Sequence, residues 1–261
     1  MSVSVIVPTW NRAAKVELAI RSVLSQTHAP LEVLVCDDGS TDDTERVVAS
    51  FNDKRVIWLP GVWSGRPAVP RNRGLGHSRG DWIAFLDDDD VWLPEKLEKQ
   101  LVLANKLGCK AVCSNAHRLD PGQGIVGELL AWDCQKITFV DLLNVNQVIC
   151  SSALVDRSVF EVVSAFPEDS SLKALEDYAL WLRVATQTDF AFVAEPLLTY
   201  RDDAANSVRS LKACYWRQRG AVLDDFIRWA RKSDISPVYF WKVTGKRTID
   251  LFARFTSLLA G

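Results

Sequence analysis

In the stretch Phe85-Leu86-Asp87-Asp88-Asp89-Asp90-Val91-Trp92, four consecutive carboxylates directly follow an apolar run, and the rest of the chain is organised around them. That run, Trp82-Ile83-Ala84-Phe85-Leu86, has the length and composition of a buried strand. A strand that ends in carboxylates places them at its C-terminal edge, where open α/β sheets bind ligands. Repulsion among the four carboxylates favours a hard divalent cation, with phosphate groups as further ligands. The alternative is an acidic turn that caps the helix beginning at Pro94-Glu95-Lys96-Leu97.

The residues before this stretch alternate between strand and helix patterns. Strands are expected at 4–7, 31–36 and 55–59, and helices at 13–26, 41–51 and 70–78. The alternation predicts an α/β fold with a mostly parallel, doubly wound sheet and right-handed crossovers. The second strand ends in Asp37-Asp38, so two strands bring carboxylate pairs to one edge of the sheet. No G-x-G-x-x-G or Walker A motif follows the first strand, which argues against dinucleotide-dependent dehydrogenases and P-loop enzymes.

The second half of the chain contains further short elements. We expect strands at 111–115, 151–155, 190–193 and 197–201, and a loop or hairpin within 118–135. Helices are expected at 94–107, 139–145 and 157–163, and another opens at 175–178. Ser40 or Thr41 is a plausible cap for the helix at 41–51. Two long helices, 211–233 and 236–259, end the chain.

Composition places the chain among globular proteins of the cytosol. Its 261 residues are 48% hydrophobic and 25% charged, and no apolar run approaches the roughly 20 residues that span a bilayer. The N-terminus has no basic segment and reads as a strand, so no signal peptide is expected. The six cysteines are scattered without zinc-site spacing, which favours buried, reduced thiols.

The C-terminal segment differs in charge from the rest of the chain. From Leu211 onward it has ten Lys or Arg and four Asp, which gives a charge of +6. Because the whole chain has a net charge of −2, the preceding part has a charge of −8. Its basic, aromatic, amphipathic helices suit an anionic membrane surface or a lipid-diphosphate acceptor. The alternative is that the two helices pack on the catalytic body or on another subunit. No nucleic-acid partner is expected.

Five elements, in this order, resemble the family 2 inverting glycosyltransferases with a nucleotide-sugar-binding fold of the GT-A type. The resemblance covers roughly residues 3–205. The matching segments are Val5-Ile6-Val7-Pro8-Thr9-Trp10-Asn11-Arg12, Val35-Cys36-Asp37-Asp38-Gly39-Ser40-Thr41-Asp42, Arg71-Asn72-Arg73-Gly74 with Gly80-Asp81-Trp82-Ile83, Phe85-Leu86-Asp87-Asp88-Asp89-Asp90, and Glu176-Asp177 with Trp181-Leu182-Arg183.

The resemblance implies a domain plan and an activity. A catalytic domain would occupy 1–208, with a nucleotide-sugar half at about 1–110 and an acceptor half at about 111–208, followed by a helical extension at 209–261. The implied reaction is metal-dependent, inverting transfer of a hexose or N-acetylhexosamine from a nucleotide sugar, with UDP favoured. The implied acceptor is a lipid-linked glycan of bacterial surface polysaccharide, at the cytoplasmic face of the inner membrane. A non-catalytic nucleotide-sugar-binding protein and a nucleotidyltransferase are the alternatives.

The resemblance assigns several residues to the donor. Pro8, Thr9 and Arg12 lie in the first loop, where the family holds the base. Asp38 matches the residue that accepts a hydrogen bond from the imide N–H of uracil, as an ionised carboxylate can. Arg71 lies near a predicted helix N-terminus and would approach the diphosphate. Asn72 also matches a family position, and the alternative is that it only caps the same helix.

Within the acidic run, the resemblance separates the four carboxylates. Asp89 would bind Mn²⁺ or Mg²⁺ at the diphosphate, and Asp88 would reach the ribose. Asp87 is grouped with the donor-binding residues and also ends the strand, while Asp90 is expected to cap the following helix. The chain departs from the family in one place, since Asp203 stands where many relatives have a histidine. Either Asp203 supplies an oxygen ligand, or the metal site is completed elsewhere.

The last matching element supplies the implied catalytic residues. Asp177 resembles the base that removes the proton of the acceptor hydroxyl. Glu176 would orient the acceptor or raise the pKa of Asp177 by like-charge repulsion. The alternative is that Glu176-Asp177 only favours a helix N-terminus.

Overall fold

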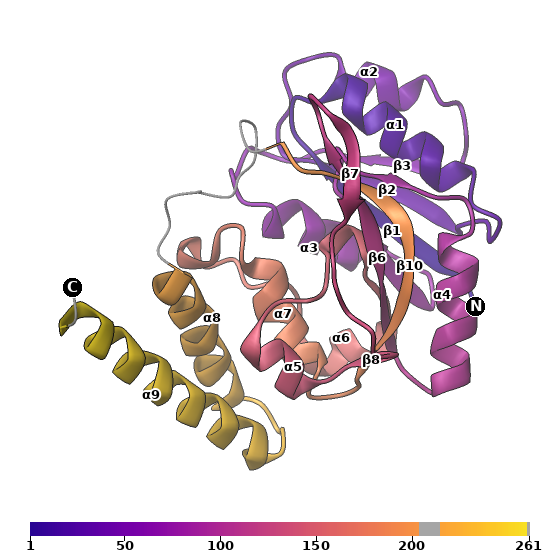
Figure 1. The fold of residues 1–261 in the computed structure, drawn as a ribbon. Helices are drawn as coiled ribbons and strands as arrows, with labels where there is room; N and C mark the ends of the chain where they lie inside the picture. The colour runs from indigo at the N-terminus through magenta and orange to yellow at the C-terminus, as the bar shows by residue number, and fades with distance from the viewer. Residues whose placement is uncertain (204–214, 260–261) are drawn as a thin grey trace.

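The computed structural model describes residues 1–203 and 215–259, which form one mixed sheet with helices on both faces (Figure 1). The strand order is β3-β2-β1-β4-β9-β6-β10-β5, with β7 paired to β6 and β8 paired to β10. The strand bounds are β1 Val3–Thr9, β2 Glu32–Asp37, β3 Val56–Leu59, β4 Trp82–Phe85, β5 Val91–Trp92, β6 Ala111–Asp120, β7 Gly124–Glu128, β8 Lys136–Ile137, β9 Leu154–Asp156 and β10 Phe190–Arg201. The expected α/β fold is confirmed, and β3, β2, β1 and β4 are parallel.

The other half of the sheet is less parallel than the sequence pattern predicts. β9 runs antiparallel between β4 and β6, and β5 runs antiparallel to β10. The strand expected at 151–155 is displaced, because Cys150–Ser152 forms a 3₁₀ turn, η1, before β9. The two late strands are a single strand, β10. Its pairing with β6 shifts register around Pro196, which has no N–H to donate to the ladder.

The helices pack in two layers, because side chains of the central strands alternate between the faces of the sheet. In β1, Val3, Val5 and Val7 enter one apolar core and Ile6 enters the other. The first face is covered by α1 (Ala13–Leu24), α2 (Thr44–Ala49) and α4 (Lys96–Leu107). The second is covered by α3 (Ala68–His77), α5 (Phe139–Asn144), α6 (Arg157–Val163) and α7 (Glu176–Val184).

Helix α3 lies unusually close to the sheet at Gly74. A Cβ atom at this position would lie 2.7 Å from Cys36 Sγ and 2.7 Å from a methyl carbon of Ile6, which is closer than packed atoms allow. The glycine in Arg71-Asn72-Arg73-Gly74 therefore lets α3 rest on β1 and β2. This contact fixes Arg71 beside the C-terminal edge of the parallel strands.

Helix α2 begins later than expected, and the predicted caps have another use. The helix starts at Thr44 instead of Thr41. The backbone N–H groups of Thr41 and Asp42 donate to Asn11 Oδ1 over 2.7 and 3.3 Å, and Ser40 Oγ accepts from the Asn11 N–H over 2.8 Å. The turn after β2 is thus tied to the loop after β1.

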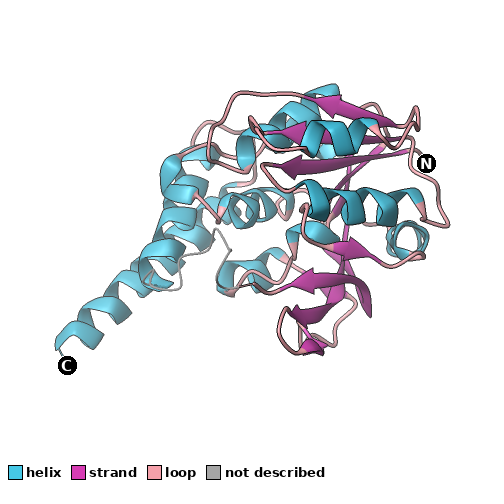
Figure 2. Ribbon diagram, turned by 90° about the horizontal axis from the view of Figure 1, so that it is seen from above, coloured by secondary structure: helices cyan, strands magenta, loops and turns pink. Residues whose placement is uncertain are grey.

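The C-terminal helices α8 (Tyr215–Ala230) and α9 (Pro237–Leu259) extend to one side of the body (Figures 1 and 2). Val222, Leu223 and Phe226 of α8 are fully buried in the core that also contains α7. Helix α9 packs on α8. The sequence alternative of packing on the catalytic body therefore applies to α8. The predicted domain boundary at 208 lies outside the described residues.

Many charges of the two helices are paired inward. Arg183 of α7 and Asp225 of α8 form a buried ion pair with 2.6 Å between Nη2 and Oδ2. Arg219 donates to the carbonyl oxygens of Leu143 and Asn144 at the end of α5, over 2.6 Å each. Some of the basic residues expected at the surface, such as Arg219, instead hold α8 to the body. None of the helices in the described ranges has the length and apolarity needed to cross a bilayer.

Candidate active site

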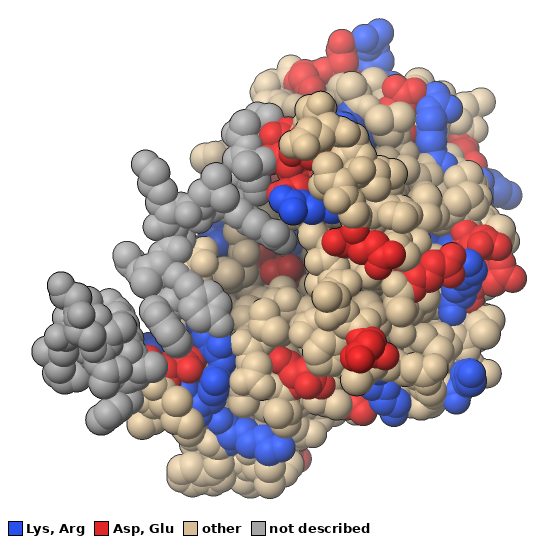
Figure 3. All heavy atoms as spheres, viewed as in Figure 1, with Lys and Arg blue, Asp and Glu red and all other residues tan. Residues whose placement is uncertain are grey.

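A cavity of about 320 Å³ opens at the C-terminal ends of β1, β2 and β4. All ten residues that the sequence assigns to a site line it: Pro8, Thr9, Arg12, Asp38, Arg71, Asp87, Asp88, Asp89, Glu176 and Asp177. Figure 3 shows the hollow near the middle of this face, with acidic side chains inside it. Segments separated by up to 195 positions along the chain therefore meet at one place, from Pro8 to Asp203.

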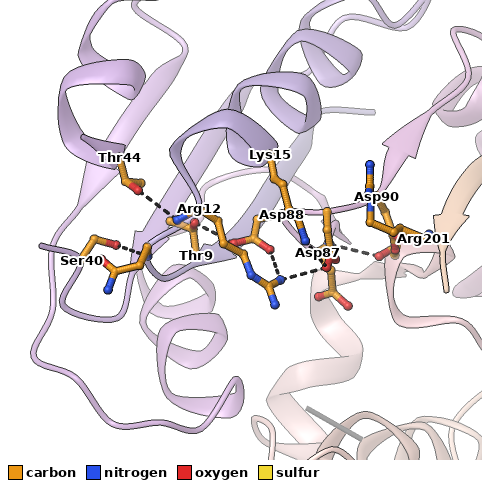
Figure 4. A network of polar contacts seen from close by, with 12 residues as sticks. Thr9, Arg12, Lys15, Ser40, Thr44, Asp87, Asp88, Asp90 and Arg201 are labelled. Atoms are coloured by element: carbon orange, nitrogen blue, oxygen red, sulfur yellow. Dashed lines mark hydrogen bonds and ion pairs between the residues drawn. The ribbon is translucent and has the colours of Figure 1, made fainter. Parts of the chain in front are cut away.

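Asp88 lies at the floor of the cavity and is held from the first loop. Its Oδ2 accepts a hydrogen bond from Thr9 Oγ1 over 2.8 Å, and its Oδ1 pairs with Arg12 Nη1 over 2.8 Å (Figure 4). Burial raises the pKa of the Asp88 carboxyl to about 6, although Arg12 acts in the opposite direction. The loop after β1 and the acidic run after β4 thus form one polar network.

Asp89 is less buried than Asp88 and faces two cations. Its Oδ2 lies 2.9 Å from Arg12 Nη1 and 3.7 Å from Lys15 Nζ. Burial and the neighbouring charge of Asp87 raise its pKa. A cation brought in with a ligand would favour the ionised form of this carboxylate.

The donor set of the cavity fits Mn²⁺ or Mg²⁺ only together with a ligand. No group of three His, Cys, Asp or Glu side chains able to hold a metal exists within the described ranges. Asp89 and Asp203 both line the cavity, however, and supply carboxylate oxygens. Mg²⁺ commonly binds through one or two carboxylates, with substrate phosphates and waters completing six ligands. The residues present match that arrangement.

Asp90 does not cap a helix, as the sequence suggested. Helix α4 begins at Lys96, and its N-cap residue, Glu95, makes no side-chain capping bond. The Asp90 carboxyl is fully buried, and its Oδ1 accepts from the backbone N–H of Arg201 over 2.9 Å (Figure 4). Burial raises its pKa well above the ordinary range. Asp90 therefore holds the end of β10, which leads to Asp203, beside the acidic run.

Arg71 joins the acidic run to α7. One nitrogen, Nη2, lies 2.6 Å from Asp87 Oδ1, and the other, Nη1, lies 2.7 Å from Glu176 Oε1. Arg71 and Glu176 are both buried, and the guanidinium carbon lies 5.5 Å from the centre of the Phe166 ring. The guanidinium expected to approach a diphosphate is therefore engaged with two carboxylates. Asn72 is inside α3 and bonds the backbone of Phe166, so it is not a helix cap.

Glu176 and Asp177 occupy the first turn of α7, where the helix starts at the cavity wall. Glu176 Oε2 accepts from the Leu175 N–H over 3.1 Å, so both of its carboxylate oxygens have partners. Asp177 is half-buried, and its Oδ1 accepts from the Tyr178 N–H over 2.8 Å. Ala174 has a φ of +63°, which is rare for a residue with a side chain. Ala174 lines the cavity together with Glu176 and Asp177.

Asp38 organises the loop between β3 and α3. Its Oδ1 accepts from the N–H and hydroxyl of Ser64 over 3.0 and 2.8 Å, and its Oδ2 accepts from the Gly65 N–H over 2.9 Å. A carboxylate has about four acceptor positions, so Asp38 can still accept one further hydrogen bond. Gly39 lies against this loop. Its φ is +82°, and a Cβ atom at this position would lie 2.7 Å from the backbone nitrogen of Trp63, so only glycine fits.

Several residues that line the cavity were not predicted as site residues from the sequence: Trp10, Trp63, Arg66, Lys173 and Arg201. Trp10 and Trp63 are exposed, and their ring centres lie 6.3 Å apart at the cavity rim. Trp10 stands within the first matching segment, so its position was a usable signal. The segment containing Trp63 and Arg66 has no periodicity, and only its anchoring on Asp38 places it in the wall.

The family profile described as glycosyl transferase family 2 matches residues 4–163. Among curated proteins, the chain is similar to the UDP-Glc:alpha-D-GlcNAc-diphosphoundecaprenol beta-1,3-glucosyltransferase WfgD of Escherichia coli. The two are 32% identical over 231 residues, which cover 86% of this chain and 86% of WfgD. It is also similar to the putative teichuronic acid biosynthesis glycosyltransferase TuaG of Bacillus subtilis, at 27% identity over 93% of this chain and 91% of TuaG.

Solved structures share the architecture. TarS of S. aureus, residues 1–349 in complex with UDP-GlcNAc, superposes with a TM-score of 0.75 at 18% identity. The superposition covers 97% of this chain and 73% of that one. The same TarS fragment in complex with UDP gives a TM-score of 0.71 at 19% identity. At this level of identity the likeness shows a shared fold.

Proposed function

Because the chain belongs to glycosyl transferase family 2, we propose that its cavity transfers a hexose or N-acetylhexosamine from a UDP-linked donor, with inversion, to a lipid-linked glycan. The chain is a glycosyltransferase by its family, and the finer assignment rests on its own residues. The observation that carries it is the meeting of ten predicted residues in one cavity at the edge of the parallel strands.

The donor would lie between the first loop and the acidic run. Asp38 retains room for one hydrogen bond and would accept the imide N–H of uracil. Asp88, which is oriented by Thr9 and Arg12, would accept from a ribose hydroxyl. TarS has been crystallised with UDP and with UDP-GlcNAc, and WfgD is named for a UDP-glucose donor. The ligands of TarS and the name of WfgD both support a UDP-linked donor for this chain.

Asp89 would hold Mn²⁺ or Mg²⁺, with Asp203 as a second oxygen ligand. When bound, the ion neutralises charge that builds up on the departing diphosphate. Arg12 and Lys15 already place positive charge beside Asp89 and would be close to the same phosphate oxygens.

Nucleotide-dependent thermal stabilisation tests this part of the site. A ligand that binds only the folded state raises stability in proportion to ln(1 + [L]/Kd). UDP with Mn²⁺ should raise Tm more than UDP with a chelator, and more than GDP, CMP or dTDP with Mn²⁺. Asp89→Asn should remove the Mn²⁺-dependent part, while Asp133→Asn, on an exposed side chain, should keep it. An Mn²⁺-independent response would refute the metal assignment and leave the donor assignment standing.

Asp177 would act as the base of a single displacement. Its carboxylate would accept the proton of the acceptor hydroxyl while that oxygen attacks the anomeric carbon and the nucleoside diphosphate leaves from the opposite face. Glu176 has both oxygens engaged by Arg71 and the Leu175 N–H, so it suits positioning better than proton transfer. The Arg71 contact would hold the first turn of α7, and with it Asp177, at a fixed distance from the acidic run.

The acceptor would approach from the rim beside Asp177. Lys173 is exposed, lines the cavity four residues before Asp177, and makes no ion pair within the part of the chain that the structure describes. A diphosphate on the acceptor would match this cation. WfgD is named for a GlcNAc-diphosphoundecaprenol acceptor. We therefore assign the enzyme to the cytoplasmic face of a membrane, in bacterial surface polysaccharide synthesis.

Product analysis tests the proposed function. The protein would be incubated with UDP-glucose or UDP-GlcNAc, Mn²⁺ and a synthetic GlcNAc-diphosphate carrying a short lipid. The expected product has one added sugar in the β configuration by proton NMR. An α-linked product would refute inversion. Binding of the donor without transfer to this or any saccharide acceptor would favour the non-catalytic alternative.

A further inference from the structure

Helix α9 has one side that is fully occupied by α8. Val243 is completely buried there, and Arg247 binds Asp224 of α8 through two contacts of 2.7 and 2.8 Å. Asp250 is also buried, with its Oδ2 2.6 Å from Arg219 Nε. Arg247 and Asp250, two charged side chains of α9, are thus turned inward.

Three large apolar side chains on the opposite side of α9 are left uncovered by the described residues. Val238, Trp241 and Ile249 are 55%, 69% and 63% exposed. Together with Gly245, which has open space around it, they recur at intervals of three or four residues. Side chains at this spacing share one side of a helix. A water-facing helix surface is ordinarily polar, so an apolar stripe with a large tryptophan indicates a missing partner.

Charge identifies the kind of partner. Among the charged side chains between Arg231 and Leu251, the exposed ones are Arg231, Lys232, Asp234 and Lys242, with a net charge of +2. Lys242 lies on the same side as Val238 and Trp241. An apolar stripe that includes a tryptophan and borders Lys242 suits the boundary between head groups and acyl chains of an anionic membrane.

The length and composition of α9 exclude a crossing of the bilayer by this helix, as found for all helices in the described ranges. The helix would therefore lie in the plane of the surface. Figure 1 shows α9 projecting from the body beyond α8, with no part of the sheet over its outer side. Such a position allows contact with a flat surface.

We propose that the outer side of α9, comprising Val238, Trp241, Lys242, Gly245 and Ile249, is a docking surface for an anionic lipid membrane. The apolar side chains would enter the head-group region, and Lys242 would face anionic phosphates. This inference does not depend on the sugar, the acceptor or the catalytic roles proposed above.

Vesicle co-sedimentation tests the docking surface. The native protein should sediment with phosphatidylcholine vesicles that contain phosphatidylglycerol, and much less with phosphatidylcholine alone. Binding should weaken as salt is added, because salt screens the exposed cations. Trp241→Ser combined with Ile249→Ser should reduce partitioning about tenfold or more, since both side chains would leave the lipid.

A matched control uses exposed apolar residues on the other helices. Leu18→Ser with Val102→Ser changes side chains of similar exposure on α1 and α4 and should leave partitioning unchanged. Thermal unfolding would show that both double variants are folded, and Trp241→Ser alone provides a milder change. Absence of native binding to anionic vesicles, or equal loss in both double variants, would overturn the proposal. A dimer in light scattering that Trp241→Ser dissociates would assign the surface to a second copy of the chain and overturn it as well.

Discussion

Arg71 occupies the centre of the site's charge arrangement, since it is the buried cation between Asp87 and Glu176. A buried carboxylate that loses its partner is destabilised far more than an exposed one. Arg71 was identified from the sequence by its motif, but its partners were not, because the spacing of residues does not reveal which carboxylate a guanidinium reaches. Its role is best measured through its coupling to Glu176.

We predict that Arg71→Met lowers the free energy of unfolding by about 3 kcal/mol, because Glu176 is left buried without a counter-charge. Adding Glu176→Gln should recover much of that loss. The transfer rate of Glu176→Gln should fall while its KM for the donor stays near the native value, since Asp177 loses its positioning. Urea unfolding and steady-state kinetics of the single and double variants check this. Additive losses of stability would contradict the coupling.

Asp88 provides a prediction about pH. Its carboxyl is buried, which raises its pKa to about 6 from an ordinary value near 3.9. Between these two pH values the folded protein binds more protons than the unfolded chain, so the free energy of unfolding falls as pH rises. The shift corresponds to about 3 kcal/mol at most.

The matched measurement is urea unfolding of native protein and Asp88→Asn from about pH 4 to pH 7, in a buffer with a metal chelator. The variant should lose less stability across this range than the native protein, because its amide does not titrate. Parallel curves would show that Asp88 does not have a raised pKa.

At the scale of elements, α3 depends on its close approach to the sheet. Gly74→Ala should destabilise the protein by about 1–3 kcal/mol, because the added methyl group overlaps Cys36 and Ile6. Gly76→Ala is the control on the same helix, since its Cβ meets nothing within 4 Å. There the better helix former should be neutral or stabilise by up to about 1 kcal/mol. Equal effects of the two substitutions on Tm would contradict the packing argument.

The helices and strands also show which parts of the secondary structure could be predicted from the sequence. Strong apolar periodicity predicted β1, α1, β4 and α7 at nearly their observed positions. β10 was divided in two, because Pro196 breaks the pattern while the chain continues across a register shift. The start of α2 was placed too early, because Ser40 and Thr41 read as caps but bond Asn11 instead. Contacts between distant loops leave no trace in local periodicity.

For the whole molecule, the order of strands and helices in the first 90 residues predicted the parallel part of the sheet and the edge where the site lies. The insertion of β9 between β4 and β6 was not predictable, since an antiparallel strand of three residues carries little signal. The C-terminal segment was identified as basic and amphipathic. Its inward ion pairs, such as Arg183 with Asp225, emerged only from the structure.

We propose that this molecule assembles a transferase site in which Asp177 accepts the proton of the acceptor hydroxyl. The most direct test compares Asp177→Asn with native protein and with Asp133→Asn, using calorimetric donor binding and transfer to a GlcNAc-diphosphate acceptor. Donor affinity should stay within a fewfold of native in all three proteins, and the transfer rate should fall at least about a hundredfold in Asp177→Asn only. Transfer by Asp177→Asn at the native rate would refute the role of Asp177 as the base.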